Sequence, residues 1–150
     1  MNKKRLFLFR TISLLLVIAL LFPVSAETIE PRASDYLASY SAYVYPAGWY
    51  KVQVWISVSG VDYMDEIGAL SIMLYESTDN ETWTWVKTFQ FSDYPDMLAY
   101  NDYYHMGHVE YQGTIGHYYK AYVGVWAGKD GDGDNRYFWT APVKATLFAG

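Results

Sequence analysis

Residues 50–59, YKVQVWISVS, alternate between apolar and polar side chains over ten positions. Because successive side chains of a strand lie on opposite faces, this pattern predicts a strand with one buried face. The predicted core side holds Tyr50, Val52, Val54, Ile56 and Val58. Trp55 is the apolar exception on the other side. No segment of the chain keeps a helical period for three turns, so the sequence predicts an all-β fold.

The same alternation recurs in residues 118–127, where the predicted inner face holds Tyr119, Ala121, Val123, Val125 and Ala127. Further strands are predicted at 36–45, 70–76, 83–91, 106–111 and 136–140, with a bulge near Lys87, and an additional strand near 143–148 is left open. In 36–45 the expected core side is Tyr36, Ala38, Tyr40, Ala42 and Val44. About seven short strands separated by turn residues predict an antiparallel β-sandwich of the immunoglobulin or fibronectin III type.

The first 26 residues have the composition of an export signal. A positively charged start is followed by an apolar stretch at 12–22 and by small residues up to Ala26. The apolar stretch is shorter than the ~20 residues that a membrane span needs. We therefore expect a secreted protein, with residues 27–150 forming one domain and no membrane attachment after the signal is cleaved.

Charge and cysteine content exclude several classes of function. Without the leader, seven basic side chains remain against sixteen acidic ones, a net charge of −9. Such a charge repels phosphate backbones, so nucleic acid is not an expected partner. The chain has no cysteine, which excludes disulfides, thiol catalysis and thiolate metal sites. The 16 tyrosines and 6 tryptophans instead supply large apolar surfaces for a core.

Several short motifs resemble a known family. They are RASDY at 32–36, MDEIGA at 64–69, YQG at 111–113 and GHYY at 116–119. These segments are similar to a family of small exported proteins, found mainly in Gram-positive bacteria and described as a domain of unknown function. The resemblance covers nearly all of 27–150 and implies a β fold outside the cell, but it supplies no catalytic residues. The GHYY segment also has the pattern of a tyrosine corner, a feature of immunoglobulin-like sandwiches.

Three aromatic residues on the outward side of 118–127 are the leading candidates for a binding site. Tyr118, Tyr122 and Trp126 lie four positions apart on the same predicted face, together with Lys120 and Gly124. Such a row offers stacking surfaces to sugar rings or to another extracellular protein. Two structural alternatives remain: the rings form cross-strand pairs that stabilise the sheet, or another segment covers them. We expect a non-enzymatic binding module, with polysaccharide or protein as its partner.

A calcium site is the candidate metal site. Asp130, Asp132 and Asp134 alternate with glycines, and carboxylate oxygens are the ligands that Ca²⁺ prefers. The match to a calcium-binding loop is incomplete, because Asn135 and Ala141 stand where that loop has Gly and Glu. The alternative is a hairpin tip, where Asp and Gly serve the geometry of the turn. No other cofactor is predicted.

Catalysis and self-association are the competing hypotheses. A glycoside hydrolase could use Asp62, Asp65 or Glu66 with Asp93 or Asp96, all in predicted loops. His105 and His108 could bind a metal, but positions three apart on a strand face opposite sides. No Gly-x-Ser-x-Gly, His-Glu-x-x-His or phosphate-loop motif is present. The sequence is also compatible with a structural or cell-surface protein that self-associates, and with a secreted antagonistic polypeptide.

Overall fold

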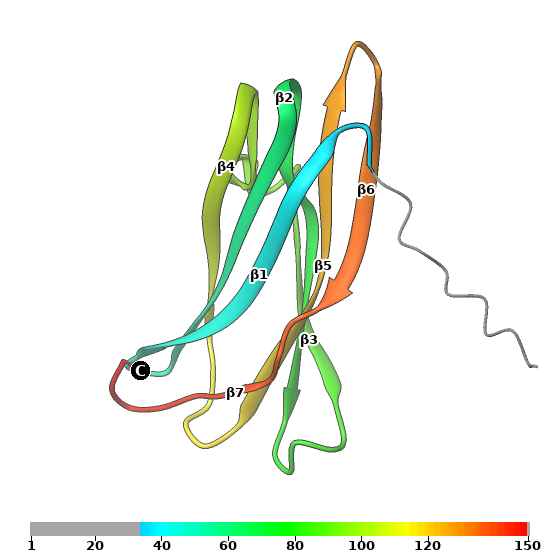
Figure 1. Cartoon of the computed structure of the whole chain (residues 1–150). Coiled ribbons are helices and arrows are strands. Elements are labelled where there is room, and N and C mark those ends of the chain that lie inside the picture. The colour runs from blue at the N-terminus through cyan, green and yellow to red at the C-terminus, as the bar shows by residue number, and fades with distance from the viewer. Residues whose placement is uncertain (1–33, 150) are drawn as a thin grey trace, which may run out of the picture. The chain divides into compact units, whose positions relative to one another are not determined.

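The computed structural model describes residues 34–149, which form seven strands and one short 3-10 turn (Figure 1). The strands are β1 (Leu37–Gly48), β2 (Lys51–Ser77), β3 (Thr84–Gln90), β4 (Leu98–Gln112), β5 (Tyr118–Lys129), β6 (Asp132–Trp139) and β7 (Val143–Lys144). The turn η1 (Pro95–Met97) precedes β4. Every strand pairing in this part of the chain is antiparallel, so the prediction of an antiparallel all-β fold is confirmed.

The predicted export signal lies outside the described residues. Within 34–149, no helix has the length and apolar character needed to cross a bilayer.

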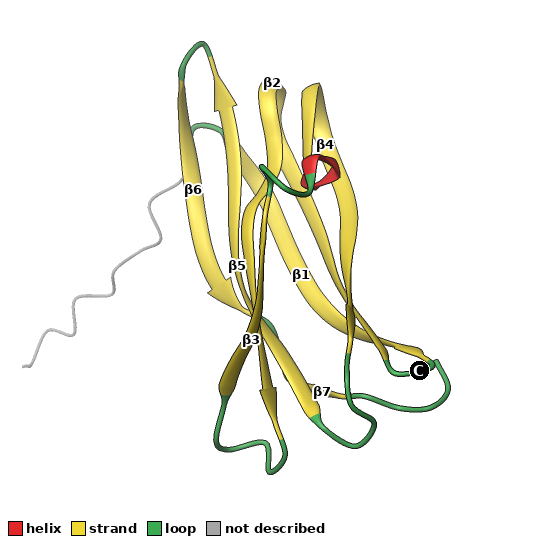
Figure 2. Cartoon of the chain, turned by 180° about the vertical axis from the view of Figure 1, so that it is seen from behind, coloured by secondary structure: helices red, strands yellow, loops and turns green. Residues whose placement is uncertain are grey.

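The long strand β2 organises the sheet. Its first half pairs with β1 on one edge and β4 on the other, and its last part pairs with β5 and β3. The main path of the sheet is β1-β2-β5-β6, while β7 pairs with the start of β5. All seven strands therefore belong to one sheet, which curls into a half-barrel (Figures 1 and 2). The division into two sheets of an immunoglobulin-like sandwich stays a prediction.

The strands predicted at 50–59 and 70–76 are one continuous strand. The segment between them contains two glycines and three carboxylates, which are local signals for a loop. In the structure this segment is part of β2, although the register of its pairing with β4 and with β5 shifts there. Met64 and Ile67 from this segment are buried. The prediction that Asp62, Asp65 and Glu66 lie in a loop was therefore wrong.

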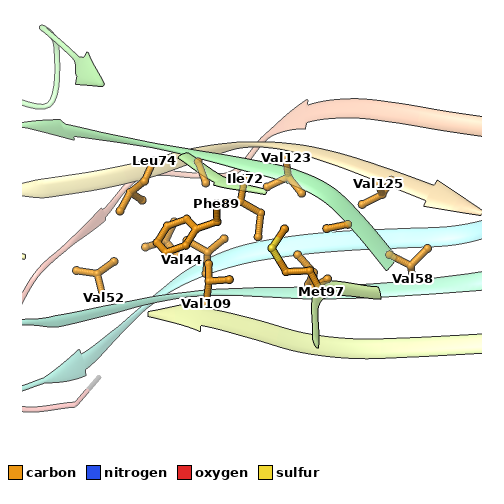
Figure 3. Close-up of a cluster of buried hydrophobic side chains, with 14 of the residues drawn as sticks. Val44, Val52, Val58, Ile72, Leu74, Phe89, Met97, Val109, Val123 and Val125 are labelled. Carbon is orange, nitrogen blue, oxygen red and sulfur yellow. The ribbon is translucent and has the colours of Figure 1, made fainter. Parts of the chain in front are cut away.

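The core fills the concave side of the curled sheet. Side chains from β1 to β5 and from η1 point toward one another there (Figure 3). The valines and isoleucine predicted inward from β2 are all at most 2% exposed, and all five inward residues of β5 are completely buried. The alternation that predicted these two strands is thus confirmed, and it fixes which side chains of β5 face outward.

The predicted facing of the first strand was partly wrong. The pairing of β1 with β2 shifts between Leu37 and Ser39, so that Ala38 is an extra residue and the alternation changes phase. Leu37 is buried as a result, and Ala38 is exposed. Tyr40 pairs with the inward Val58, as predicted, but it is 42% exposed. Tyr50, predicted to face the core, is also exposed, because it belongs to the β1–β2 turn and has a positive φ of 67°.

Other boundaries differ at strand ends. β4 begins at Leu98, eight residues before the predicted strand 106–111, and the additional strand considered at 143–148 is reduced to the two residues of β7. The bulge expected near Lys87 is confirmed: Leu74 pairs with Lys87 and Tyr75 with Trp85, which leaves Val86 as the extra residue.

The buried Tyr119 has the hydrogen bond of a tyrosine corner. Its hydroxyl accepts a bond from the Thr114 N–H at 2.8 Å and donates to the Glu76 carboxylate. The other partner of that carboxylate is His117, whose Nδ1 is 2.9 Å away. Burial, followed by the contact with Glu76, raises the pKa of Tyr119 to about 12. Glu76 is thereby tied to Tyr119 of β5 and to His117, the residue before this strand.

Candidate functional site

The outward side of β5 and its neighbours carries a cluster of aromatic rings, which we call the aromatic face. Its members come from β2, β3, β5 and β6 and from the residue before β3. They are Tyr75, Trp83, Trp85, Tyr122, Tyr137 and Trp139, together with Lys120. Figure 2 shows β3, β5 and β6, three of the strands that contribute to this face. Strand pairing, rather than sequence proximity, brings these residues together.

Tyr122 lies at the centre of the face. It pairs with Met73 of β2 on one side and with Trp139 of β6 on the other. The centroid of its ring is 4.9 Å from that of Trp139 and 5.8 Å from that of Tyr137, and the latter pair is stacked. Tyr75 extends the group, with its ring 5.1 Å from Trp139. These separations fall in the range of favourable aromatic pairs.

Lys120 lies within the face and touches two of its tryptophans. Its ammonium nitrogen is 4.2 Å from the ring centroid of Trp83 and 4.6 Å from that of Trp139. Both distances are within the range of cation–π attraction. At the edge of the face, the indole N–H of Trp85 donates to the Thr88 hydroxyl at 2.9 Å, which fixes the orientation of an exposed ring. Contacts among these side chains therefore fix the positions of several rings of the face and of its one lysine.

The predicted row lies at or beside this face, but its members are not its most exposed rings. Tyr118, Tyr122 and Trp126 are each half-buried. Trp85, Tyr137 and Trp139 are 56%, 48% and 49% exposed. Tyr122 thus supports rings that offer more surface to a ligand. Tyr137 and Trp139 occupy alternate positions of the predicted strand 136–140, and this was the signal that could have identified them.

Trp126 has a structural role that the sequence analysis did not anticipate. Its ring covers Gly128 and Gly133, and a Cβ on either glycine would lie only 2.5 Å from a ring carbon. Between Trp126 and Tyr122, the ring of Tyr137 covers Gly124 in the same way. The indole nitrogen of Trp126 is buried and has no hydrogen-bond partner in the described residues. Trp126 therefore packs on the backbone of the β5–β6 hairpin.

An open hollow of about 300 Å³ lies beside Trp126 and contains two of the candidate catalytic carboxylates, Asp65 and Glu66. Asp65 accepts a bond from the Asp130 N–H at 2.7 Å. Asp62 forms an ion pair of 3.1 Å with Lys129, and this contact raises the pKa of the lysine. Asp93 and Asp96, expected to complete a catalytic pair, are not among the residues that line this hollow.

The three aspartates of the predicted calcium loop are divided between a turn and a strand. Asp130 and Gly131 form the two-residue β5–β6 turn with φ angles of 55° and 81°, as in the type I′ turn that favours Asp-Gly. Asp132 and Asp134 belong to β6, and Asp134 accepts bonds from the Ser34 hydroxyl and the Asp35 N–H. Within 34–149, no three His, Asp or Glu side chains are grouped closely enough to hold a metal ion.

The two candidate metal-binding histidines face opposite sides of the sheet, as their spacing predicted. His105 pairs with the core residue Val58, and burial lowers the pKa of its imidazole. His108 pairs with Trp55 and stacks on its ring at 4.4 Å, while Tyr43 stacks on the far side of Trp55 at 6.5 Å. These three rings form a second, smaller aromatic surface, on β1, β2 and β4.

The chain was compared with protein-family models, curated proteins and solved structures. No protein-family model matches the chain. No curated protein matches it either. Among solved structures, a family 76 glycoside hydrolase from a bovine Bacteroides thetaiotaomicron strain is similar over 71% of this chain and 20% of that protein, at 12% identity and a TM-score of 0.30. A likeness this weak carries no argument about the fold or the activity of this chain.

Proposed function

We propose that this protein is an exported, non-catalytic binding module whose aromatic face holds a polysaccharide. The observation that supports the proposal is the set of six rings on one face, of which three are about half exposed and two contact Lys120. A pyranose ring presents C–H groups that pack on aromatic rings, so several rings on one face can contact successive sugars of a chain. Cross-strand stabilisation alone does not require rings that leave half of their surface in water.

The shape of the face favours a polymer over a small molecule. A site for a small ligand is usually a concave pocket that buries most of the ligand, whereas these rings lie on the outward side of a sheet. Contacts of this kind are weak one by one, so binding is expected to strengthen when several copies of the protein act on one chain. Asp62 contacts the last residue of β5 and Asp65 contacts the β5–β6 turn, which favours a structural role for them over catalysis.

We also propose that the curled sheet acts as a sandwich. The half of β2 that pairs with β1 and β4 would form one layer, and the half that pairs with β3 and β5 would form the other. The core residues between the halves, and the tyrosine-corner bond of Tyr119, support this description. In that arrangement the aromatic face and the Trp55 surface lie on opposite outer sides of the molecule.

The test is retention of the purified protein on insoluble glycans and isolated bacterial cell walls. The wild type is compared with a Tyr137→Ala, Trp139→Ala double variant, whose side chains are half exposed and whose loss should leave the core intact. The control is Tyr43→Ala on the second aromatic surface, a residue that is 54% exposed. We expect the double variant to lose retention and the control to keep it.

Retention of the double variant at the wild-type level would reject the aromatic face as the binding site. Failure of the wild type to bind any of the materials would reject polysaccharide binding. Light scattering of the wild type across a concentration series would then examine the alternative of self-association. An increase in mass that the double variant lacks would favour a self-associating surface protein.

A further inference from the structure

The basic side chains of this acidic protein fall into two groups. Within 34–149, Lys51, Lys129 and Arg136 each lie within 4 Å of a carboxylate. The other three, Lys87, Lys120 and Lys144, lie over aromatic rings and form no ion pair in this part of the chain. An ammonium group held by rings keeps its N–H donors available to an external anion, whereas a group paired with a carboxylate is already neutralised.

Two of these three unpaired cations belong to the side of the sheet that carries the aromatic face. Lys120 lies between Trp83 and Trp139. Lys144 of β7 pairs with Tyr118 of β5, and its nitrogen is 5.3 Å from the centroid of that ring. The aromatic face therefore carries one cation among its rings and a second one at its edge.

No carboxylate stands at the paired positions around the two lysines. The outward positions of β5 from Tyr118 to Trp126, and the residues paired with them on β2 and β6, include no Asp or Glu. Along the outward positions of β5, the next one beyond Trp126 is Gly128, which pairs with Glu66 at the hollow. The face is thus locally basic on a protein whose net charge would repel anions.

We propose that the aromatic face binds a carboxylated polysaccharide, a polymer of uronic acid rings, and that Lys120 receives the carboxylate of a ring stacked on its tryptophan neighbours. This inference rests on the proposed function of the face and names its ligand class. The ammonium group of Lys120 lies between two tryptophan rings, so a sugar that stacks beside it would need its negative charge on the sugar ring itself. A polyol phosphate has the charge but lacks the ring, and a neutral glycan has the ring but leaves Lys120 without a partner.

The experiment compares two polymers that differ only in charge. Polygalacturonate and its carboxyl-reduced product have the same backbone, so their affinities for the purified protein, measured by calorimetry, isolate the contribution of the carboxylate. We expect the wild type to bind polygalacturonate about ten times more tightly, since a charge-assisted hydrogen bond contributes at about this level. Alginate and a sialylated glycan, tested in parallel, distinguish a uronate polymer from a terminal acidic sugar.

Three variants connect the preference to the named residue. Lys120→Gln should reduce binding of polygalacturonate to the level of the reduced polymer, and Lys120→Arg, which keeps the charge and the stacking, should restore it. Lys51→Gln is the matched control, because it removes a lysine that is paired with Glu110 on the other aromatic surface. Tryptophan fluorescence and circular dichroism confirm that each variant is folded.

The possible failures are distinguishable. Equal affinity for the two polymers, with loss of both in the Tyr137→Ala, Trp139→Ala variant, would overturn the carboxylate preference and leave glycan binding in place. A preference that Lys120→Gln does not change would overturn the role of Lys120. Failure of the wild type to bind either polymer or any other glycan would reject the proposed function together with this inference.

Discussion

Replacing Tyr119 by phenylalanine tests the link between the end of β2 and the start of β5. The substitution keeps the buried ring and removes one oxygen atom. That atom accepts the Thr114 N–H and donates to the Glu76 carboxylate. No cavity of the size of a side chain is created, so the change in the free energy of unfolding reports the two hydrogen bonds.

The expected cost follows from the two groups that lose a partner. A hydrogen bond to a charged group contributes about 1.5–3 kcal/mol, and an ordinary bond such as that from the N–H of the exposed Thr114 contributes about 0.5–1.5 kcal/mol. Glu76 keeps its contact with His117, and its side chain is 25% exposed in a hollow at the end of β2, so water replaces part of the loss. We therefore expect Tyr119→Phe to lower the free energy of unfolding by about 2–3 kcal/mol.

The assay is urea unfolding at pH 7, followed by tryptophan fluorescence. Tyr111→Phe is the control, because its ring packs 6.2 Å from that of Tyr119 and its hydroxyl has no hydrogen-bond partner in the described residues. This control should change stability by less than about 0.5 kcal/mol. A double-mutant cycle with Glu76→Gln separates the carboxylate bond from the backbone bond. If Tyr119→Phe matched the control, the tyrosine corner would contribute nothing to stability and the argument would fail.

Three further predictions use the same methods. Gly124→Ala should displace the Tyr137 ring, because the added Cβ would lie 2.4 Å from a ring carbon, so we expect polysaccharide retention to fall while the protein stays folded; unchanged retention would mean that Tyr137 is not used. Hydrogen bonds from the Thr82 and Glu81 N–H groups hold the pKa of Asp79 well below its ordinary range. Its contribution to the free energy of unfolding is therefore present above about pH 4 and is lost as the pH falls toward the pKa that Asp79 has in the folded protein. The difference in urea midpoint between wild type and Asp79→Ala should therefore be constant above about pH 5 and shrink progressively below about pH 4, and a difference that keeps its full neutral-pH size at about pH 2 would contradict this. Because Asp130, Asp132 and Asp134 are not grouped for metal binding, millimolar calcium should leave the melting temperature unchanged, whereas a rise that Asp132→Asn abolishes would revive the calcium hypothesis.

The sequence predicted the strands whose signal is local. In β5 every inward residue is apolar, so alternation alone gave both the strand and its buried side. In the middle of β2 the local signal was misleading. Gly60, Gly68 and Asp62 favour a loop, but β4 and β5 pair with this segment and Met64 and Ile67 are buried from it. Tertiary pairing outweighed turn propensity.

The candidate site depended on information that alternation does not contain. Tyr122 was predicted to face outward, and it does. Its neighbours Trp139 and Tyr75 come from other strands, and only the register of β5 with β6 and β2 places them beside it. Trp126 shows the reverse case. Its outward position suggested a ligand contact, whereas the two glycines beneath its ring give it a structural use.

The length of β2 also determines how the chain can fold. Its partners on β4 and β5 are 30 to 62 residues away along the chain, from the pair Gly68 with Leu98 to the pair Glu66 with Gly128. The chain must lose the entropy of closing such loops before the paired strands stabilise it. This places the protein among the slower-folding β domains, with folding times of milliseconds to seconds. Until β5 has been synthesised, a strand of 27 residues has an open edge on at least one side. The chain is therefore most prone to aggregation after β2 has been synthesised and before β5 has paired with it.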